Sequence, residues 1–251
     1  MQKPIRIAVL ECDTPLDKIK ARHGGYGNIF ERLLKVAATE MHTPDFVNAD
    51  DLHVTKFHVQ EKMEYPNIED IDAILITGSR FNSFDNDPWI TKLVQFTQDI
   101  LAQTRVRIIG VCFGHQIVGR ALGVKVDRSN AGWETSVLPM TLTPKGKELF
   151  KKDIINIHQM HRDIVYAYPP GVEALGHSPR CDVQGMYAQN RLLTVQGHPE
   201  FTQEIMEELC ETRHAQKIFD DELYADSMRR VADAQDGVVV AQAFLRFLVE
   251  G

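Results

Sequence analysis

Strand-like and helix-like segments alternate along the first half of the chain. Four short segments have the length and the Ile and Val content of strands, and they cover residues 5–10, 56–60, 71–77 and 106–111. Between them, apolar residues recur at helical spacing, and the predicted helices cover residues 28–38, a segment that begins at Asp87-Pro88, and residues 114–122. Strands that alternate with helices predict a parallel sheet covered by helices on both faces.

The pattern changes after this half. Residues 124–196 contain several strand-like pieces and few helical ones, and the last strand is predicted at residues 192–196. This predicts antiparallel strands beside or at the edge of the parallel sheet. After Phe201 the apolar spacing is helical to the end of the sequence. The fold class is therefore expected to be α/β: a mostly parallel central sheet flanked by helices, with an additional small antiparallel sheet and a helical C-terminus.

The length and composition are those of a globular protein. The sequence has 251 residues, of which 43% are hydrophobic and 25% charged. We expect one domain over residues 1–251, with a core at 1–201 and a helical C-terminal extension at 202–251.

The net charge and the cysteines bear on which partners, metal sites and cellular compartment are expected for the protein. A net charge of -7 argues against nucleic acid or a membrane as partner, and no apolar stretch has the length of a membrane span. The four cysteines form no C-x-x-C pair, so no metal site is predicted from them. So few cysteines suit a reducing compartment, and we expect a cytoplasmic protein, with the nucleus as the alternative.

One cysteine stands in a motif that predicts chemistry. A predicted strand runs into Gly110-Val111-Cys112-Phe113-Gly114 and a predicted helix follows, which is the spacing of a nucleophile elbow with cysteine in place of serine. The glycines leave room where a Cβ would clash, and the helix N-terminus favours a thiolate on Cys112. The N–H of Phe113 is well placed for a developing oxyanion. A small buried cysteine in a tight turn is the alternative. A structural role is predicted for the other cysteines: Cys12, Cys181 and Cys210.

A histidine after the last predicted strand is the best candidate for the base that a cysteine nucleophile needs. His198 follows the strand at its carboxyl end, where catalytic groups of parallel sheets gather. Glu200 is two residues further on and can accept a hydrogen bond from the imidazole. A surface His–Glu pair would give the same pattern.

A third candidate piece follows the strand predicted at residues 71–77. That strand ends in Gly78-Ser79, and such a turn exposes backbone N–H groups that can complete an oxyanion hole. An ordinary strand-to-loop turn has the same sequence pattern.

Together these residues resemble the triad type of the class I glutamine amidotransferase domains. The resemblance rests on Gly110-Val-Cys112-Phe-Gly114-His-Gln116 and on Gly197-His198-Pro199-Glu200, and it covers roughly residues 5–201. It implies a catalytic triad of Cys112, His198 and Glu200, with the Gly78-Ser79 turn as the oxyanion strand. It further implies that Gln116 helps to hold a glutamyl group. His161 and Asp163 match the H-x-D substrate loop of relatives, although a solvated loop is the alternative.

Within this family the chain looks like the stand-alone branch of plant γ-glutamyl peptidases and uncharacterised fungal relatives. The residues that carry this likeness are Gly24-Gly25-Tyr26, Gly78-Ser79, Asp87-Pro88-Trp89-Ile90 and Gly132-Trp133-Glu134. No attached synthase is recognised in the sequence, so a use for released ammonia would need a separate protein.

Two functions are therefore expected as alternatives. The first is hydrolysis of a small-molecule γ-glutamyl amide, a glutathione-type peptide or glutamine, through a γ-glutamyl thioester on Cys112. This chemistry requires no metal and no organic cofactor. The second is a glutaminase subunit that works only with a synthase partner. The intact triad argues against a third reading, a non-catalytic binding module.

Overall fold

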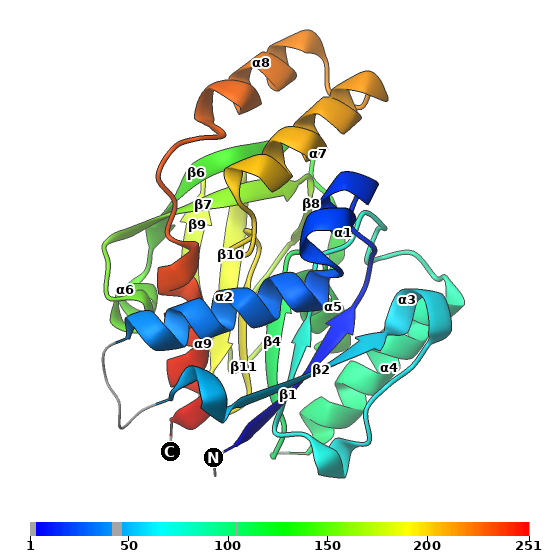
Figure 1. Cartoon of the computed structure of the whole chain (residues 1–251), viewed down its shortest axis with the longest axis vertical. Helices are drawn as coiled ribbons and strands as arrows, with labels where there is room; N and C mark the ends of the chain where they lie inside the picture. Colours follow the sequence, from blue (N-terminus) through cyan, green and yellow to red (C-terminus); the bar gives the residue numbers. More distant parts are fainter. Residues whose placement is uncertain (1–3, 42–46, 104, 251) are drawn as a thin grey trace.

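The computed structural model describes residues 4–41, 47–103 and 105–250. Its centre is a nine-stranded sheet in the order β2-β1-β3-β4-β11-β10-β9-β6-β7 (Figure 1). The first five strands in this order are parallel, and the other four join them through antiparallel pairs. A separate antiparallel pair is formed by β5 and β8. The predicted α/β fold class, including the antiparallel strands at the edge of the parallel sheet, is confirmed.

The parallel strands are β1 (Ile5–Glu11), β2 (Leu52–His58), β3 (Ala73–Ile76), β4 (Arg107–Val111) and β11 (Leu192–Val195). The strands of the antiparallel half are β6 (Glu134–Leu142), β7 (Ile154–His161), β9 (Glu173–Ser178) and β10 (Cys181–Ala188), and the small sheet pairs β5 (Val126–Arg128) with β8 (Asp163–Val165). The helices are α1 (Asp17–His23), α2 (Tyr26–Glu40), α3 (Val59–Lys62), α4 (Pro88–Ala102), α5 (Phe113–Ala121), α6 (Pro144–Phe150), α7 (Gln203–Ala215), α8 (Asp221–Arg230) and α9 (Gly237–Val249). Short 3-10 turns cover Ala49–Asp51 and Ile68–Asp70.

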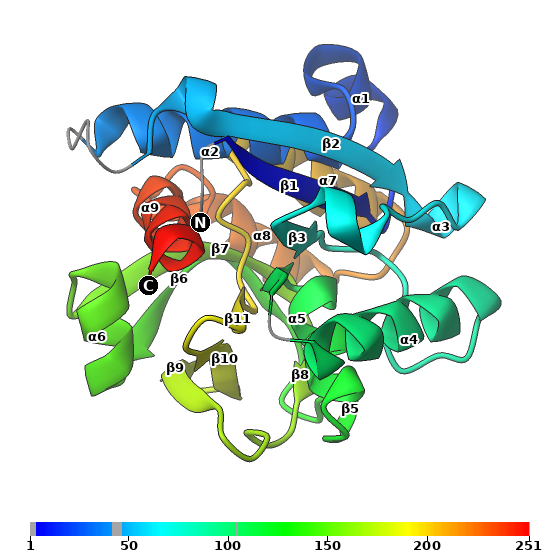
Figure 2. The same ribbon diagram turned by 90° about the horizontal axis from the view of Figure 1, so that it is seen from below.

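The parallel strands other than the edge strand β2 are apolar on both faces because helices cover both faces of the sheet (Figure 2). In β1, the side chains of Ile7 and Val9 pack in one core cluster with α2 and α9, and those of Ala8 and Leu10 pack in a second cluster with α4 and α5. Successive side chains of a strand point to opposite faces, so a continuous apolar run serves both clusters.

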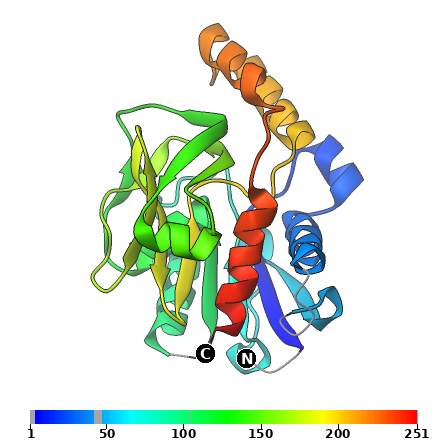
Figure 3. The same ribbon diagram turned by 90° about the vertical axis from the view of Figure 1, so that its left-hand side faces the viewer.

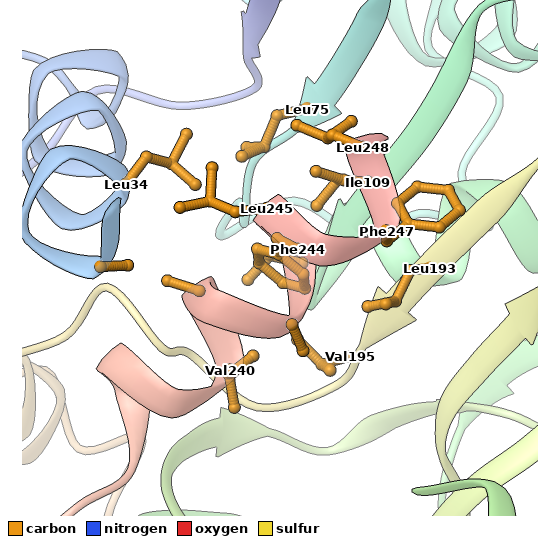
Figure 4. Close-up of a cluster of buried hydrophobic side chains, with 14 of the residues drawn as sticks. Leu34, Leu75, Ile109, Leu193, Val195, Val240, Phe244, Leu245, Phe247 and Leu248 are labelled. Carbon is orange, nitrogen blue, oxygen red and sulfur yellow. The ribbon is translucent and has the colours of Figure 1, made fainter. Parts of the chain in front are cut away.

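Helix α9 lies inside the main core although it is the last element of the chain. Phe244, Leu245 and Leu248 are fully buried and pack among residues of the parallel strands, such as Leu75 and Ile109 (Figure 4). Helices α7 and α8 extend beyond the end of the sheet near α1 (Figure 3). The segment 202–251 therefore contains both a core helix and a projecting pair, and its description as an extension stays a prediction.

Several boundaries differ from those predicted. Strand β2 begins at Leu52 rather than at residue 56, and residues 59–62 form α3. β2 is an edge strand in which only Leu52 is buried, so it carries little apolar signal. Asp87 is the N-cap residue of α4, but its side chain makes no cap hydrogen bond. Pro88 is the first residue of the helix, where its fixed φ favours the helical conformation.

Candidate active site

The Cys112 turn has the geometry of a nucleophile elbow. Strand β4 ends at Val111, α5 begins at Phe113, and Cys112 between them has φ 51° and ψ -102°, which L residues rarely adopt. A Cβ on Gly114 would lie 2.2 Å from the carbonyl oxygen of Ile76, and one on Gly110 would lie 2.8 Å from the carbonyl oxygen of Gly114. Both approaches are to backbone atoms, so glycine is required at both positions.

The elbow is held by backbone hydrogen bonds to the neighbouring strand. The N–H of Cys112 donates to the carbonyl oxygen of Val195 at 2.9 Å, which ties the turn to the end of β11. Cys112 is 5% exposed and sits at the N-terminus of α5, so the unpaired N–H groups of the first helical turn lie beside its sulfur.

His198 and Glu200 form a buried pair beside Cys112. The Nδ1 of His198 donates to Oε1 of Glu200 at 2.8 Å, and both residues are 4% exposed. The N–H of His198 donates to the carbonyl oxygen of His158 on β7 at 2.7 Å, and the imidazole stacks on Phe201 with 3.9 Å between ring centroids. The imidazole is therefore fixed by a carboxylate, a backbone bond and an aromatic ring.

The groups packed around His198 shift its pKa. Burial alone lowers the pKa of an imidazole, but the charge of the Cys112 sulfur, then that of Glu200, and hydrogen bonds to both raise the pKa of His198 to about 10. His158 lies next to it without an anionic partner, and burial followed by the charge of His198 lowers the pKa of His158 to about 4. The pKa values of these two adjacent histidines are therefore shifted in opposite directions.

The Gly78-Ser79 turn lies against the side chains of His198 and Cys112. A Cβ on Gly78 would be 2.7 Å from Cε1 of His198 and 3.7 Å from Cβ of Cys112. The preceding residue, Thr77, donates its N–H to the carbonyl oxygen of Leu10 at 3.2 Å, which links the turn to β1. The N–H of Phe113 begins α5 and has no acceptor within the helix, so it stays available for an oxyanion.

Gln116, which the resemblance assigns to substrate binding, is buried and bonded to other protein groups. Gln116 is 3% exposed: its amide oxygen accepts from Ser83, and its amide nitrogen donates to the backbone oxygen of Asp163 and to Gln196. These bonds place Gln116 in the protein interior beneath the elbow, and its role as a substrate ligand stays a prediction.

His161 and Asp163 are both engaged with protein groups. The Nε2 of His161 lies 3.1 Å from Oε2 of Glu134, and both side chains are 3% exposed. The carboxylate of Asp163 accepts from Nε of Arg128 at 3.1 Å. This segment is the end of β7 and the start of β8 rather than a solvated loop, and its substrate-binding role stays a prediction.

A pocket with an empty volume of about 720 Å³ opens beside the His198–Glu200 pair. It is lined by the turn at Gly78-Ser79-Arg80, by residues between Asp13 and Tyr26, and by Met160 and Phe201. Three residues of α7 and its C-cap residue complete the lining: Leu209, Thr212, Arg213 and Gln216. The wall formed by α7 was not predicted. Its spacing of i, i+3, i+4 and i+7 marks one helical face, but nothing in the sequence indicates that this face meets the active site.

Two charged side chains of this pocket, those of Asp13 and Arg213, differ in their partners. Asp13 accepts from the backbone N–H of Arg80 at 2.8 Å and forms an ion pair of 2.7 Å with the Arg80 guanidinium. Burial lowers the pKa of Arg213, while the charge of Cys112 acts in the opposite direction. The Nε of Arg213 is buried without a hydrogen-bond partner.

Neither a metal-binding cluster nor a membrane-spanning helix occurs in residues 4–41, 47–103 and 105–250. Within these ranges no group of three or more His, Cys, Asp or Glu side chains is arranged to hold a metal ion. Among the helices described there, none combines the length and apolar character needed to cross a membrane.

Comparisons with known proteins agree with this geometry. Residues 40–214 match the family model described as glutamine amidotransferase class-I. The chain is 33% identical over 248 residues to a glutamine amidotransferase-like protein of Schizosaccharomyces pombe, covering 97% of this chain and 98% of that protein. It is 28% identical to gamma-glutamyl peptidase 2 of Arabidopsis thaliana, covering 87% and 85% of the two chains.

A solved structure shows the same fold. The crystal structure of a glutamine amidotransferase from Thermotoga maritima superposes with a TM-score of 0.68 at 15% identity, over 99% of this chain and 100% of that one. The matches to the family model and to the relatives cover most of the chain and include the elbow and the His198 turn. The chain therefore belongs to the class I glutamine amidotransferase family.

Proposed function

We propose that the protein hydrolyses γ-glutamyl amide bonds, with Cys112 as nucleophile, His198 as proton carrier and Glu200 as the residue that orients it. The observation that carries the proposal is the buried His198–Glu200 pair beside a cysteine at the end of β4 and the start of α5. A cysteine in such a turn, next to a positively charged imidazole, is arranged for nucleophilic attack on a carbonyl carbon.

The first half of the proposed reaction forms an acyl-enzyme. The Cys112 thiolate attacks the side-chain carbonyl carbon of the γ-glutamyl group, and the oxyanion receives hydrogen bonds from Phe113 N–H and the Gly78-Ser79 turn. The C–N bond then breaks as the imidazolium of His198 gives its proton to the leaving amine. A γ-glutamyl thioester and a free amine result.

The second half releases glutamate. Forming the thioester removes the negative charge of the thiolate, which is the largest of the influences that raise the pKa of His198. The imidazole, neutral after acylation, then takes a proton from water as water attacks the thioester. The thiolate leaves, the imidazolium is restored, and the Cys112–His198 pair is ready for the next substrate.

The proposed substrates are glutathione-type γ-glutamyl peptides or glutamine. The plant relatives named gamma-glutamyl peptidases support the first class, and the family name supports the second. The alternative is a glutaminase that passes ammonia to a separate synthase partner, and it would use the same three residues. All four cysteines are free, which suits the proposed location in the cytoplasm or nucleus.

The test is release of glutamate by the purified chain from a series of γ-glutamyl peptides and from glutamine. We expect turnover of at least one peptide by the wild type, none by Cys112→Ala, and an adduct of one glutamyl residue on Cys112 in quenched reactions analysed by mass spectrometry. Glutamine turnover that appears only with an added synthase would support the alternative. Equal activity of wild type and Cys112→Ala would overturn the proposal.

A further inference from the structure

The charged groups that line the pocket beside His198 are paired with one exception. Asp13 is paired with Arg80, and Glu200 is paired with His198. Arg213 is the remaining cation: among the described residues its guanidinium has no hydrogen bond or ion pair, and its contact is the face of Trp133, 5.2 Å from the ring centroid. A buried guanidinium donor without an acceptor costs free energy, and a ligand that supplies an anionic acceptor recovers it.

The position of Arg213 relative to the reacting groups indicates which part of a substrate it meets. The charge of Cys112 acts on Arg213, and both Arg213 and His198 line the same pocket. His198 delivers its proton to the leaving nitrogen, so that nitrogen lies next to the imidazole, and atoms attached to it extend into the pocket lined by Phe201 and α7. Ammonia released from glutamine would leave this space unfilled.

The guanidinium of Arg213 determines which chemical group of a ligand it can bind. A guanidinium presents several N–H donors in a plane, and a carboxylate is the acceptor that matches this geometry in peptides. Tyr26, also in the pocket, adds a neutral hydroxyl donor, because burial, followed by the charges of Asp13 and Glu200, raises the pKa of its phenol. The lining therefore offers one unpaired positive charge to a substrate.

We propose that Arg213 binds a carboxylate on the leaving group, so that the site selects γ-glutamyl peptides over glutamine and over uncharged γ-glutamyl amides. This inference rests on the hydrolysis proposed above and specifies its substrate class. Arg213 acts here as a specificity-determining residue supplied by α7, separate from the three residues that carry the reaction.

The test compares substrates that differ only in that carboxylate. The pairs are γ-glutamylglycine with γ-glutamylglycinamide, and γ-glutamylglycylglycine with its C-terminal amide, which together cover two lengths of leaving group. For each pair, the ratio of the kcat/KM values is measured for the wild type, Arg213→Gln and Arg213→Lys. The ratio cancels any effect of Arg213 on the Cys112 thiolate, because both substrates meet the same thiolate.

We expect the wild type to prefer the acid over the amide in at least one pair. Arg213→Gln should lower kcat/KM for that acid by about 10- to 100-fold, the range for a lost charge-assisted hydrogen bond, and leave the amide within about threefold. Arg213→Lys should restore part of the preference, since it keeps the charge but not the planar donors. The matched control is Arg229→Gln on α8, an exposed arginine paired with Asp226, which should leave all ratios unchanged.

A second measurement keeps the test informative if Arg213→Gln folds poorly. Binding of each peptide and its amide to Cys112→Ala, measured by calorimetry, should show the same preference for the acid without any turnover. Equal binding of acid and amide, or an equal loss of both substrates in Arg213→Gln, would overturn the role of Arg213 and leave the proposed hydrolysis standing. A wild type that cleaves neither acid nor amide would overturn both.

Discussion

The pocket beside His198 has two kinds of wall, and they are held in different ways. The turns at the carboxyl ends of the parallel strands are tied by main-chain hydrogen bonds: Cys112 to Val195, His198 to His158, and Thr77 to Leu10. Helix α7 packs instead through side chains such as Ile205 and Met206 in a small cluster apart from the two main cores.

This difference in how the two walls are held suggests different roles: the turns for the proposed reaction and α7 for the choice of substrate. Main-chain hydrogen bonds, together with the close approaches at Gly110 and Gly114, hold the turns that carry Cys112, His198 and Gly78. The α7 wall presents side chains on one helical face, and these line the pocket; in the described part of the chain, α7 makes no main-chain hydrogen bond to the turns like that of Cys112 with Val195. We therefore expect variants of the turns to lose the reaction and variants of α7 to change its substrates.

The largest effect is expected at the nucleophile. Cys112→Ser keeps the shape of the elbow but replaces the thiolate with a poorly ionised hydroxyl, and we expect kcat to fall by about 10⁴-fold or more. Glutamate release under saturating substrate measures it, with Cys181→Ser, a buried cysteine of β10, as the matched control. Near-wild-type turnover by Cys112→Ser would remove Cys112 from its role.

The next effect concerns the imidazole and its carboxylate. We expect His198→Ala to lower kcat/KM by roughly 10²- to 10⁴-fold and Glu200→Gln to lower it less, because an amide oxygen still accepts from the imidazole N–H. The three residues act as one unit, so the double variant should be about as slow as His198→Ala. If Glu200→Gln were slower than His198→Ala, or if the two losses multiplied, the triad would be wrong, and Asp163 would be the first carboxylate to test.

A substitution at Gly114 can disturb the Cys112 turn without changing Cys112, His198 or Glu200. A Cβ at Gly114 would lie 2.2 Å from the oxygen of Ile76, a backbone atom in a buried strand, and we expect Gly114→Ala to lower the free energy of unfolding by about 3 kcal/mol. Gly171 has a positive φ of 76° but open space around it, so Gly171→Ala should cost about 1 kcal/mol for the backbone strain alone. Urea unfolding followed by circular dichroism compares them, and equal losses would show that the close approach is not limiting.

The reactivity of the four thiols tests the electrostatics of the elbow. We expect iodoacetamide near neutral pH to label Cys112 at least about tenfold faster than the others. Burial raises the pKa of Cys181 to about 12 and that of Cys210 to about 11, and also raises that of Cys12. Peptide mapping after short exposures measures the rates, and earlier labelling of any other cysteine would contradict the assignment.

The smallest expected effect is a shift in pH dependence. With the pKa of His198 at about 10, the imidazolium needed for acylation is lost only as the pH rises through that value, so kcat/KM should hold to high pH and then fall. Removing the charge of Glu200 lowers this pKa, so the fall in Glu200→Gln should begin about one pH unit lower. An unchanged alkaline limb would show that Glu200 does not stabilise the charged imidazole.

Much of the fold was predictable because it rests on local patterns. The apolar runs of β1, β3 and β4 are buried on both faces, and the elbow glycines mark a turn whose geometry admits no side chain. The start of the edge strand β2 was predicted four residues too late because most of its positions are partly or fully exposed, which weakens the apolar signal. The side chains of Gln116 and His161 could be named by resemblance, but their buried partners lie far away in sequence: Gln196 for the first and Glu134 for the second.

The sequence by itself determined the strand-to-helix turn at Cys112 and the position of His198 just after a strand, because glycine spacing and strand ends are local properties of the chain. Only the tertiary structure decided that the pKa of His198 is raised and that of His158 is lowered, since these shifts depend on the groups packed around each ring. It also decided that α9 enters the core while one face of α7 lines the pocket. Both helices have apolar faces, and what each face meets is set by contacts with strands and turns distant in sequence.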